Sequence, residues 1–329
     1  MQQVILERPG KFRIQEKPEP AAGAGEALVK IHRIGVCGTD LHAFAGRQPF
    51  FDYPRVLGHE LGVEVLSLPT DGAVPEGISV GSRCAIEPYL YCGECPTCRA
   101  GRTNCCHRLR TLGVHTDGGM QATFAIPVRL LHPSASLSFD QLALVETLGI
   151  GAQAVRRSQL SGAESALVVG AGPIGLAVIQ FAQASGARVR VLEPNPLRRD
   201  FVARLGVEAA ADWSGFDRQP ADIVFDATGN LASMENSFDL VAPGGRLVFV
   251  GLVIGRVSFD DPSFHRRELT ILASRNSAGL FPWIIQRIEQ GVIDTQPWIT
   301  HRLALSSVPD RFPELPGQPQ LVKALIEVD

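Results

Sequence analysis

The sequence lacks an uninterrupted apolar stretch long enough to cross a membrane. Its longest apolar run, residues 166–179, is broken by three glycines and by Pro173, whereas a membrane-spanning helix needs about 20 mostly apolar residues. Low-complexity segments, internal repeats and long runs of one charge are also missing. We therefore expect no membrane association through a spanning helix, and infer the domain organisation from where the local patterns change.

An excess of either charge is missing as well. The 31 Lys and Arg residues nearly balance the 34 Asp and Glu residues, which gives a net charge of −3. A general nucleic-acid binder usually carries a basic surplus, so this class is disfavoured. Residues 1–12 include Glu7, Arg8 and Lys11 and do not resemble a secretory signal. The expected location is the cytoplasm, where thiols stay reduced.

What the sequence has in quantity is glycine and proline, with 33 and 23 residues respectively. Many turns are expected, rather than a helical bundle, and 329 residues are enough for about two domains. Short β-like runs at 27–31, 62–66 and 82–86 precede residue 153. The sequence therefore predicts a mostly β first domain.

Beyond residue 153 the pattern becomes strand, glycine turn and helix. The apolar strand 166–169 leads into a GxGxxG motif and then into a helical run at 176–184. The glycines of such a motif allow a tight turn, close approach of a pyrophosphate and packing of the helix on the strand. The residues of this predicted phosphate-binding turn are Gly170, Gly172, Pro173, Ile174 and Gly175.

An acidic residue follows where a dinucleotide fold needs one. Glu193 ends the next predicted strand, 188–192, and lies 18 residues after Gly175, a position suited to the adenosine ribose hydroxyls. This carboxylate favours NAD over NADP, although Arg198 and Arg199 follow and are either a solvated helix face or partners for a 2′-phosphate. Later strands at 223–226 and 246–250 predict a doubly wound parallel α/β sheet.

Seven cysteines divide into a cluster and separate residues. Cys92, Cys95, Cys98 and Cys106 have the spacing of a closed tetrahedral zinc site. The adjacent Cys105 leaves the fourth ligand open between two residues. Disulfides are the alternative, but reduced thiols and metal fit the expected compartment better. Cys84, in an apolar stretch, is predicted to be a buried core thiol.

A second potential metal site is formed by Cys37-Gly-Thr-Asp-Leu-His42 together with Gly58-His59-Glu60. Thiolate, imidazole and carboxylate are all zinc ligands, and a catalytic site keeps one coordination position open. Taken alone, Cys37 and His59 are equally compatible with ordinary core residues. The two motifs together predict a catalytic zinc.

In motif order and spacing, nearly the whole chain resembles the zinc-dependent medium-chain alcohol dehydrogenases. Val145-Glu-Thr-Leu148, Leu112-Gly-Val-His-Thr-Asp-Gly-Gly119 and Glu193-Pro194 make it similar to the branch with sorbitol, threonine and galactonate dehydrogenases. The resemblance implies a GroES-like catalytic domain over 1–153 and 293–329, a Rossmann NAD domain over 154–292, and a homodimer or homotetramer.

The resemblance also implies roles for the residues of the first motif. Zinc is held by Cys37, His59 and either Glu60 or Glu146; family members usually have Pro after the second acid, where this chain has Thr147. Asp40 orients the zinc-bound imidazole or merely caps a helix. Thr39 passes the alcohol proton, through the cofactor ribose, to His42, whose ordinary pKa is close to neutral. A surface histidine is the alternative for His42.

The expected reaction is oxidation of a secondary hydroxyl on a polyol, sugar acid or related small alcohol. The cofactor-binding residues predicted in addition to the glycine turn are Glu193, Arg198, Thr228, Gly251 and Arg275. Candidate partners for a substrate carboxylate are His115, Arg110 and Arg275, whereas Phe50, Phe51 and Tyr53 either line the substrate pocket or pack in the core.

Three other functions remain open at this stage. A dehydrogenase of simple or aryl alcohols would have the same motifs. A zinc-free quinone reductase would use NADPH and would lack the ligands found at Cys37, His59 and Glu60. A non-catalytic NAD- or zinc-binding regulator would be indicated by loss of Thr39, His42 or the ligands, all of which are present.

Overall fold

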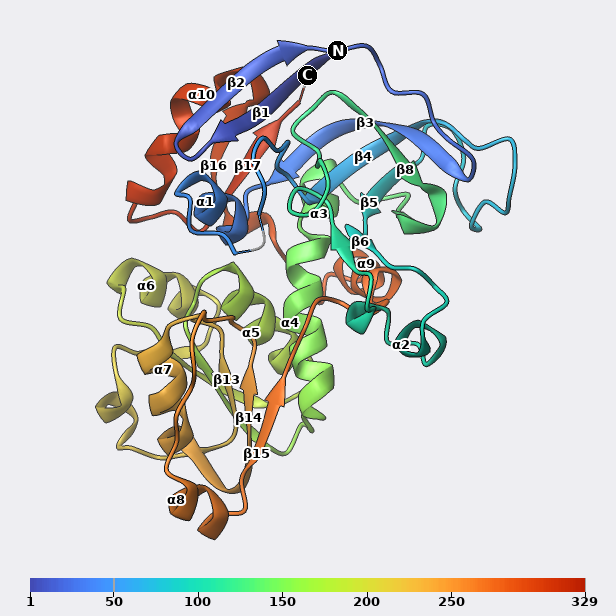
Figure 1. Cartoon of the computed structure of the whole chain (residues 1–329). Coiled ribbons are helices and arrows are strands. Elements are labelled where there is room, and N and C mark those ends of the chain that lie inside the picture. The colour runs from blue at the N-terminus through green and yellow to red at the C-terminus, as the bar shows by residue number, and fades with distance from the viewer. Residues whose placement is uncertain (50, 329) are drawn as a thin grey trace. The chain divides into compact units, whose positions relative to one another are not determined.

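The computed structural model describes residues 1–49 and 51–328 and divides into two compact units (Figure 1). The first comprises Met1–Glu146 and Phe281–Asp329, and the second Thr147–Leu280. Among the described residues, no helix is both long enough and apolar enough to span a bilayer.

The chain passes between the compact units at 146–147 and 280–281, and the domain limits of 153 and 293 stay a prediction. Helix α4 (Val145–Ser158) is continuous through residue 153. Helix α9 (Phe281–Glu289) packs on the first unit, where the Phe281 ring lies 5.1 Å from that of His132 and Glu289 accepts a 2.6 Å hydrogen bond from Ser134.

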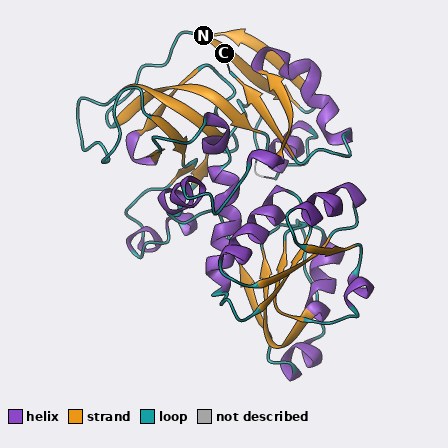
Figure 2. Cartoon of the chain, turned by 180° about the vertical axis from the view of Figure 1, so that it is seen from behind, coloured by secondary structure: helices purple, strands orange, loops and turns teal. Residues whose placement is uncertain are grey.

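The first unit is built mainly from strands, as Figure 2 shows. Its strands are β1 (Gln2–Arg8), β2 (Lys11–Glu16), β3 (Glu26–Gly35), β4 (Glu60–Ser67), β5 (Arg83–Ile86), β6 (Tyr89–Leu90), β7 (Arg110–Thr111), β8 (Thr123–Pro127), β9 (Leu131–Pro133), β16 (Ile299–Ala304) and β17 (Lys323–Glu327). The short helices are α1 (Gly38–Phe44), α2 (Pro96–Arg99), α3 (Phe139–Ala143) and α10 (Val308–Arg311). The predicted mostly β domain is confirmed.

A seven-stranded sheet forms the frame of this unit. Its order is β16-β17-β3-β4-β5-β9, and β8 also pairs with β3. Strand β3 alternates buried and half-buried residues, as expected for a strand with one face on the core. That core includes Val29, Ile31 and Val63, all fully buried. The sheet carries the chain returning at β17 directly alongside β3, which brings the C-terminal segment next to the first motif.

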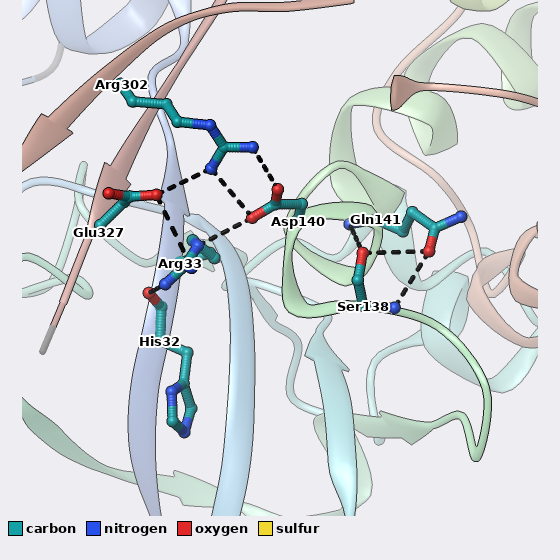
Figure 3. Close-up of polar contacts among 7 residues, drawn as sticks. All are labelled: His32, Arg33, Ser138, Asp140, Gln141, Arg302 and Glu327. Atoms are coloured by element: carbon teal, nitrogen blue, oxygen red, sulfur yellow. Dashed lines mark hydrogen bonds and ion pairs between the residues drawn. The ribbon is translucent and has the colours of Figure 1, made fainter. Parts of the chain in front are cut away.

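A network of ion pairs joins the C-terminal strands β16 and β17 to β3 and α3 (Figure 3). Arg302 of β16 binds Asp140 of α3 at 2.5 Å and Glu327 of β17 at 2.9 Å. Arg33 of β3 binds Asp140 at 2.8 Å. Helix α3 itself begins at a capping box in which Ser138 and Gln141 exchange hydrogen bonds. Asp140 thus links two strands, β3 and β16, to helix α3.

Replacing Asp140 with Asn is expected to lower the free energy of unfolding by about 1 kcal/mol at neutral pH, since half-exposed ion pairs are screened by water. Burial alone would raise the pKa of Asp140, but hydrogen bonds and charge from Arg302 and Arg33 lower it below its ordinary value. The contribution is therefore complete above the unfolded pKa of about 3.9 and disappears as the pH falls through the folded pKa. Denaturant titrations at pH 7 and in acid test this, with exposed Asp200→Asn as control; an Asp140 effect that grows in acid would contradict it.

The second unit has a six-stranded parallel sheet with helices on both faces (Figure 2). Its strands are β10 (Ser165–Val169), β11 (Arg188–Leu192), β12 (Glu208–Ala210), β13 (Ala221–Asp226), β14 (Val241–Phe249) and β15 (Thr270–Ala273). Its helices, apart from α4, are α5 (Pro173–Ala184), α6 (Pro196–Arg204), α7 (Leu231–Asn236) and α8 (Asp261–Arg266). The strand order β12-β11-β10-β13-β14-β15 reverses direction at β10, which confirms the predicted doubly wound sheet.

Candidate zinc and dinucleotide sites

The four clustered cysteines come together around one point in the first unit. The Sγ atoms of Cys92 and Cys98 are 3.9 Å apart, those of Cys95 and Cys106 are 3.9 Å apart, and those of Cys92 and Cys106 are 3.5 Å apart. Tetrahedral zinc with bonds of about 2.3 Å to sulfur requires about 3.8 Å between sulfurs. Cys105 is exposed and lies outside the group. The geometry fits zinc and identifies Cys106 as the fourth member.

Hydrogen bonds lower the pKa of the Cys92 and Cys95 thiols, whereas burial raises the pKa of the Cys98 thiol. The backbone NH groups of Cys95 and Arg108 donate to the sulfurs of Cys92 and Cys106 at 3.4 and 3.3 Å. The Thr97 hydroxyl lies 3.1 Å from Cys95, and this contact, with backbone NH groups, lowers the pKa of the Cys95 thiol to about 5. Donors to the charged form favour deprotonation, which metal binding requires.

Replacing Cys95 with Ser is expected to remove the zinc of this cluster and to lower the melting temperature, because a structural metal contributes to folding. Metal analysis and thermal unfolding measure both effects. The matched control is Cys105→Ser, which changes an exposed thiol outside the cluster and should alter neither. Unchanged zinc content and melting in Cys95→Ser would contradict the structural role.

The other group of ligands is assembled by the β3 and β4 pair. Cys37 follows β3 as the N-cap of α1, while His59 directly precedes β4 and Glu60 begins it, after a turn at Gly58. Gly35 pairs with Glu60 in the antiparallel ladder. Gly58 has φ +96°, a conformation that side chains disfavour, and a Cβ there would lie 2.9 Å from Ile34. After this turn, His59 lies close to Cys37.

Cys37, His59 and Glu60 form a compact group that fits a metal ion. Their ligand atoms all lie within 4.8 Å of one another. Burial opposes protonation of His59, yet Asp40, Cys37 and Glu146 raise its pKa well above the ordinary value. This negative potential is the environment in which a buried dication is stabilised. The structure thus brings the predicted ligands together.

The two candidate glutamates are held by different donors. Glu60 is 1 % exposed, and its carboxylate oxygens lie 2.6 and 2.5 Å from Nζ of Lys323, which is also buried. Glu146, in the first turn of α4, accepts a hydrogen bond on Oε1 from the Tyr89 hydroxyl. Burial raises the pKa of Glu146. Glu60 belongs to the compact group and Glu146 does not.

Asp40 caps a helix and also lies near His59. It caps α1 by accepting the backbone NH of Cys37 at 2.9 Å on Oδ2. Its other oxygen, Oδ1, lies 3.8 Å from Nδ1 of His59, and neither atom has a hydrogen-bond partner among the described residues. The role of Asp40 in orienting a metal-bound His59 stays a prediction. Thr39 is half-buried and His42 is exposed on α1, as an exit for protons would require.

The glycine turn lies between β10 and α5, as predicted. A Cβ at Gly175 would be 1.9 Å from the Gly170 carbonyl oxygen, so only glycine permits this packing. Glu193 is buried and accepts the NH of Ala171 at 2.8 Å and that of Asn195 at 2.9 Å. Its carboxylate is therefore fixed beside the turn.

The two arginines after Glu193 differ in position. Nη1 of Arg198 would be 4.0 Å from a Cβ on Gly172, which places this guanidinium at the glycine turn. Arg199 instead donates to the carbonyls of Glu193 and Pro194 at 2.8 and 2.7 Å. Neither is simply a solvated helix face.

Thr228 and Gly251 occupy neighbouring turns at the ends of β13 and β14. A Cβ at Gly251 would lie 2.4 Å from the Gly229 nitrogen. Thr228 donates to the fully buried Asp226 through its NH at 3.0 Å and its hydroxyl at 2.7 Å. Arg275 is exposed after β15, and its contact with cofactor or substrate stays a prediction.

Fewer contacts in the structure bear on the residues that were predicted to line a substrate pocket. His115 accepts the NH of Thr111 at 3.0 Å on Nδ1, and Arg110 is exposed on β7. Phe51 and Tyr53 pack against the core of the first unit with ring centroids 4.8 Å apart, which favours the core interpretation. Phe50 lies outside the described residues.

Two residues of the metal centre were missed from the sequence. Lys323 interrupts an apolar segment, 321–326, and this isolated charge was an available signal. Tyr89 had no distinguishing pattern. Cys84 is fully buried, as predicted, and burial raises the pKa of its thiol to about 12.

Comparisons with known proteins match both units. The alcohol dehydrogenase GroES-like domain matches residues 23–136, and the zinc-binding dehydrogenase family matches residues 173–290. L-galactonate-5-dehydrogenase of Escherichia coli K12 is 38% identical, with 99% of this chain and 98% of that protein covered. The 2-dehydro-3-deoxy-L-galactonate 5-dehydrogenase of Pseudoalteromonas atlantica is 34% identical, with 96% and 95% covered.

A solved structure is also similar throughout. RspB from E. coli CFT073, complexed with NADH, has a TM-score of 0.92 and 27% identity, and 99% of each chain is covered. L-threonine 3-dehydrogenases and a sorbitol dehydrogenase are further relatives, which confirms the predicted branch. From its motifs, fold and relatives, the chain belongs to the zinc-binding medium-chain alcohol dehydrogenase family, as a zinc-type alcohol or polyol dehydrogenase.

Proposed function

We propose that this enzyme oxidises a secondary hydroxyl of a polyol or sugar acid to a ketone, reversibly, with NAD. The observation that carries the proposal is the compact Cys37, His59 and Glu60 group in a chain that aligns along 99% of its length with an L-galactonate-5-dehydrogenase. Dehydrogenases of simple or aryl alcohols have the same chemistry, so the substrate class rests on the relatives.

Each residue of the site has a separate task in the proposed reaction. When bound, zinc polarises the substrate hydroxyl as a Lewis acid, and NAD accepts the hydride. Asp40 fixes the orientation of the His59 ring. Thr39 accepts a hydrogen bond from the substrate hydroxyl and, as it takes up that proton, gives up its own toward His42, which is exposed on α1 and releases a proton to solvent. We infer that the third protein ligand is Glu60, because it lies within the compact group.

NAD is preferred over NADP because of Glu193. Its carboxylate is held by two backbone NH groups at 2.8 and 2.9 Å, and each oxygen keeps a further lone pair for a ribose hydroxyl. A 2′-phosphate there would be repelled by the carboxylate. Arg198, beside the glycine turn, supplies a positive charge for the cofactor phosphates.

The oligomeric state and the cellular compartment of the protein are further proposals. A homodimer or homotetramer is expected from the family resemblance. The cysteine cluster suits a reducing compartment such as the cytoplasm, where thiolates remain available for metal.

The proposal is tested by following NAD reduction with polyols, aldonates, threonine and simple primary alcohols, each with and without a zinc chelator. Chelator-sensitive oxidation of a polyol or aldonate, with little activity toward primary alcohols, is the expected result. Turnover of simple primary alcohols alone would overturn the substrate class. No NAD reduction with any of these substrates, despite bound zinc and NAD, would favour a non-catalytic regulator.

A further inference from the structure

The phenol of Tyr89 is a buried donor next to the metal-binding group. Tyr89 begins β6 and is 4% exposed, and its hydroxyl donates to Oε1 of Glu146. A hydrogen bond from a hydroxyl to a carboxylate is short and stronger than one between neutral groups. Both partners are shielded from water, so breaking this bond would leave a buried carboxylate poorly satisfied.

Glu146 is close enough to the ligands to interact with them electrostatically. Burial raises the pKa of its carboxyl, and the charges of His59, Glu60 and Lys323 act on it as well. However, the compact group with ligand atoms within 4.8 Å contains Cys37, His59 and Glu60, and Glu146 is outside it. The centre therefore has a spare carboxylate beside its three candidate ligands.

A catalytic zinc site must keep one coordination position open for water or substrate. A spare anion near a dication is the group best suited to close that position. Glu60 is restrained by the charge of Lys323, with both oxygens within 2.6 Å of the ammonium. The group that restrains Glu146 is the Tyr89 hydroxyl, which donates a hydrogen bond to its carboxylate.

We propose that Tyr89 is a positioning residue that holds Glu146 away from the metal and so keeps the fourth coordination position open. This inference rests on the proposed function, since it assumes a zinc held by Cys37, His59 and Glu60. It assigns the two glutamates different tasks, because Glu60 binds the metal and Glu146 stays beside it. Loss of the phenol hydroxyl would let Glu146 close the site.

The test is Tyr89→Phe, which removes the hydroxyl and keeps the ring. Release of the catalytic zinc to an excess of chelator is followed with a zinc-sensitive dye. It should slow by about tenfold, because Glu146 would then bind the metal as an additional ligand. Changing the hydrogen-bond partners of metal ligands typically alters metal affinity by about 10–100-fold. The kcat should fall because the open position is occupied. Tyr89→Phe combined with Glu146→Gln should restore the wild-type release rate, since the amide is a much weaker zinc ligand.

Three controls separate the explanations. Tyr91→Phe keeps the ring that lies 4.5 Å from the Arg129 guanidinium and should release zinc as the wild type does. Cys37→Ser identifies the catalytic release phase by abolishing it, while the cysteine cluster still releases its metal. Melting curves check that every variant is folded.

Zinc release from folded Tyr89→Phe that is unchanged or faster would overturn the positioning role, because a merely structural contact or a ligating Glu146 would give those results. A wild-type protein without any phase that depends on Cys37 would instead overturn the zinc site of the proposed function. The two failures are therefore distinguishable.

Discussion

Cys37→Ala and His59→Ala are expected to abolish turnover while leaving NAD binding intact. Each variant removes one of three ligands whose donor atoms lie within 4.8 Å. A Lewis-acid metal contributes several kcal/mol to the barrier, so loss of the metal should reduce kcat by on the order of a thousandfold or more. The glycine turn and Glu193 belong to the other unit and are not altered.

The measurements are kcat with the best substrate of the panel, zinc content, and the Kd of NAD by calorimetry. Matched controls are Cys105→Ser, an exposed thiol outside both metal groups, and His265→Ala, an exposed histidine on α8. Both controls should retain wild-type activity. Full activity in Cys37→Ala or His59→Ala would rule out zinc-dependent chemistry at this centre.

The local motifs explain why so much of this site could be predicted. Cys92, Cys95 and Cys98 are close in sequence, so their spacing alone restricts the loop geometry. The glycine turn likewise lies within one strand-turn-helix unit, and its physical requirements act over a few residues. Patterns of this range can be interpreted without knowing how distant segments pack.

The interactions that were missed join distant parts of the chain. Lys323 is 263 residues from Glu60, and Asp140 is 162 residues from Arg302. Tyr89 and Glu146 are 57 residues apart. No periodicity or spacing rule relates such pairs, because sheet register and helix packing place them together.

Lys323→Met is expected to be among the most destabilising single changes in the first unit. Lys323 is 2% exposed and pairs with Glu60, which is 1% exposed. Burial disfavours the charged amine, but Glu60, Cys37 and Glu146 raise the pKa of Lys323 above its ordinary value. Removing one partner of a buried ion pair typically costs about 3–5 kcal/mol, because the other charge remains buried without compensation.

The loss should be larger after the metal has been stripped. Asp40, Glu60 and Glu146 are three buried acids around one histidine and one lysine, and a bound dication would offset part of their mutual repulsion. Denaturant unfolding with and without chelator measures both losses. Lys11→Met, which breaks an exposed pair with Glu7, is the control and should cost less than about 1 kcal/mol. A Lys323→Met loss no greater than that of Lys11→Met, or one insensitive to metal, would mean that Lys323 does not balance the charge of this centre.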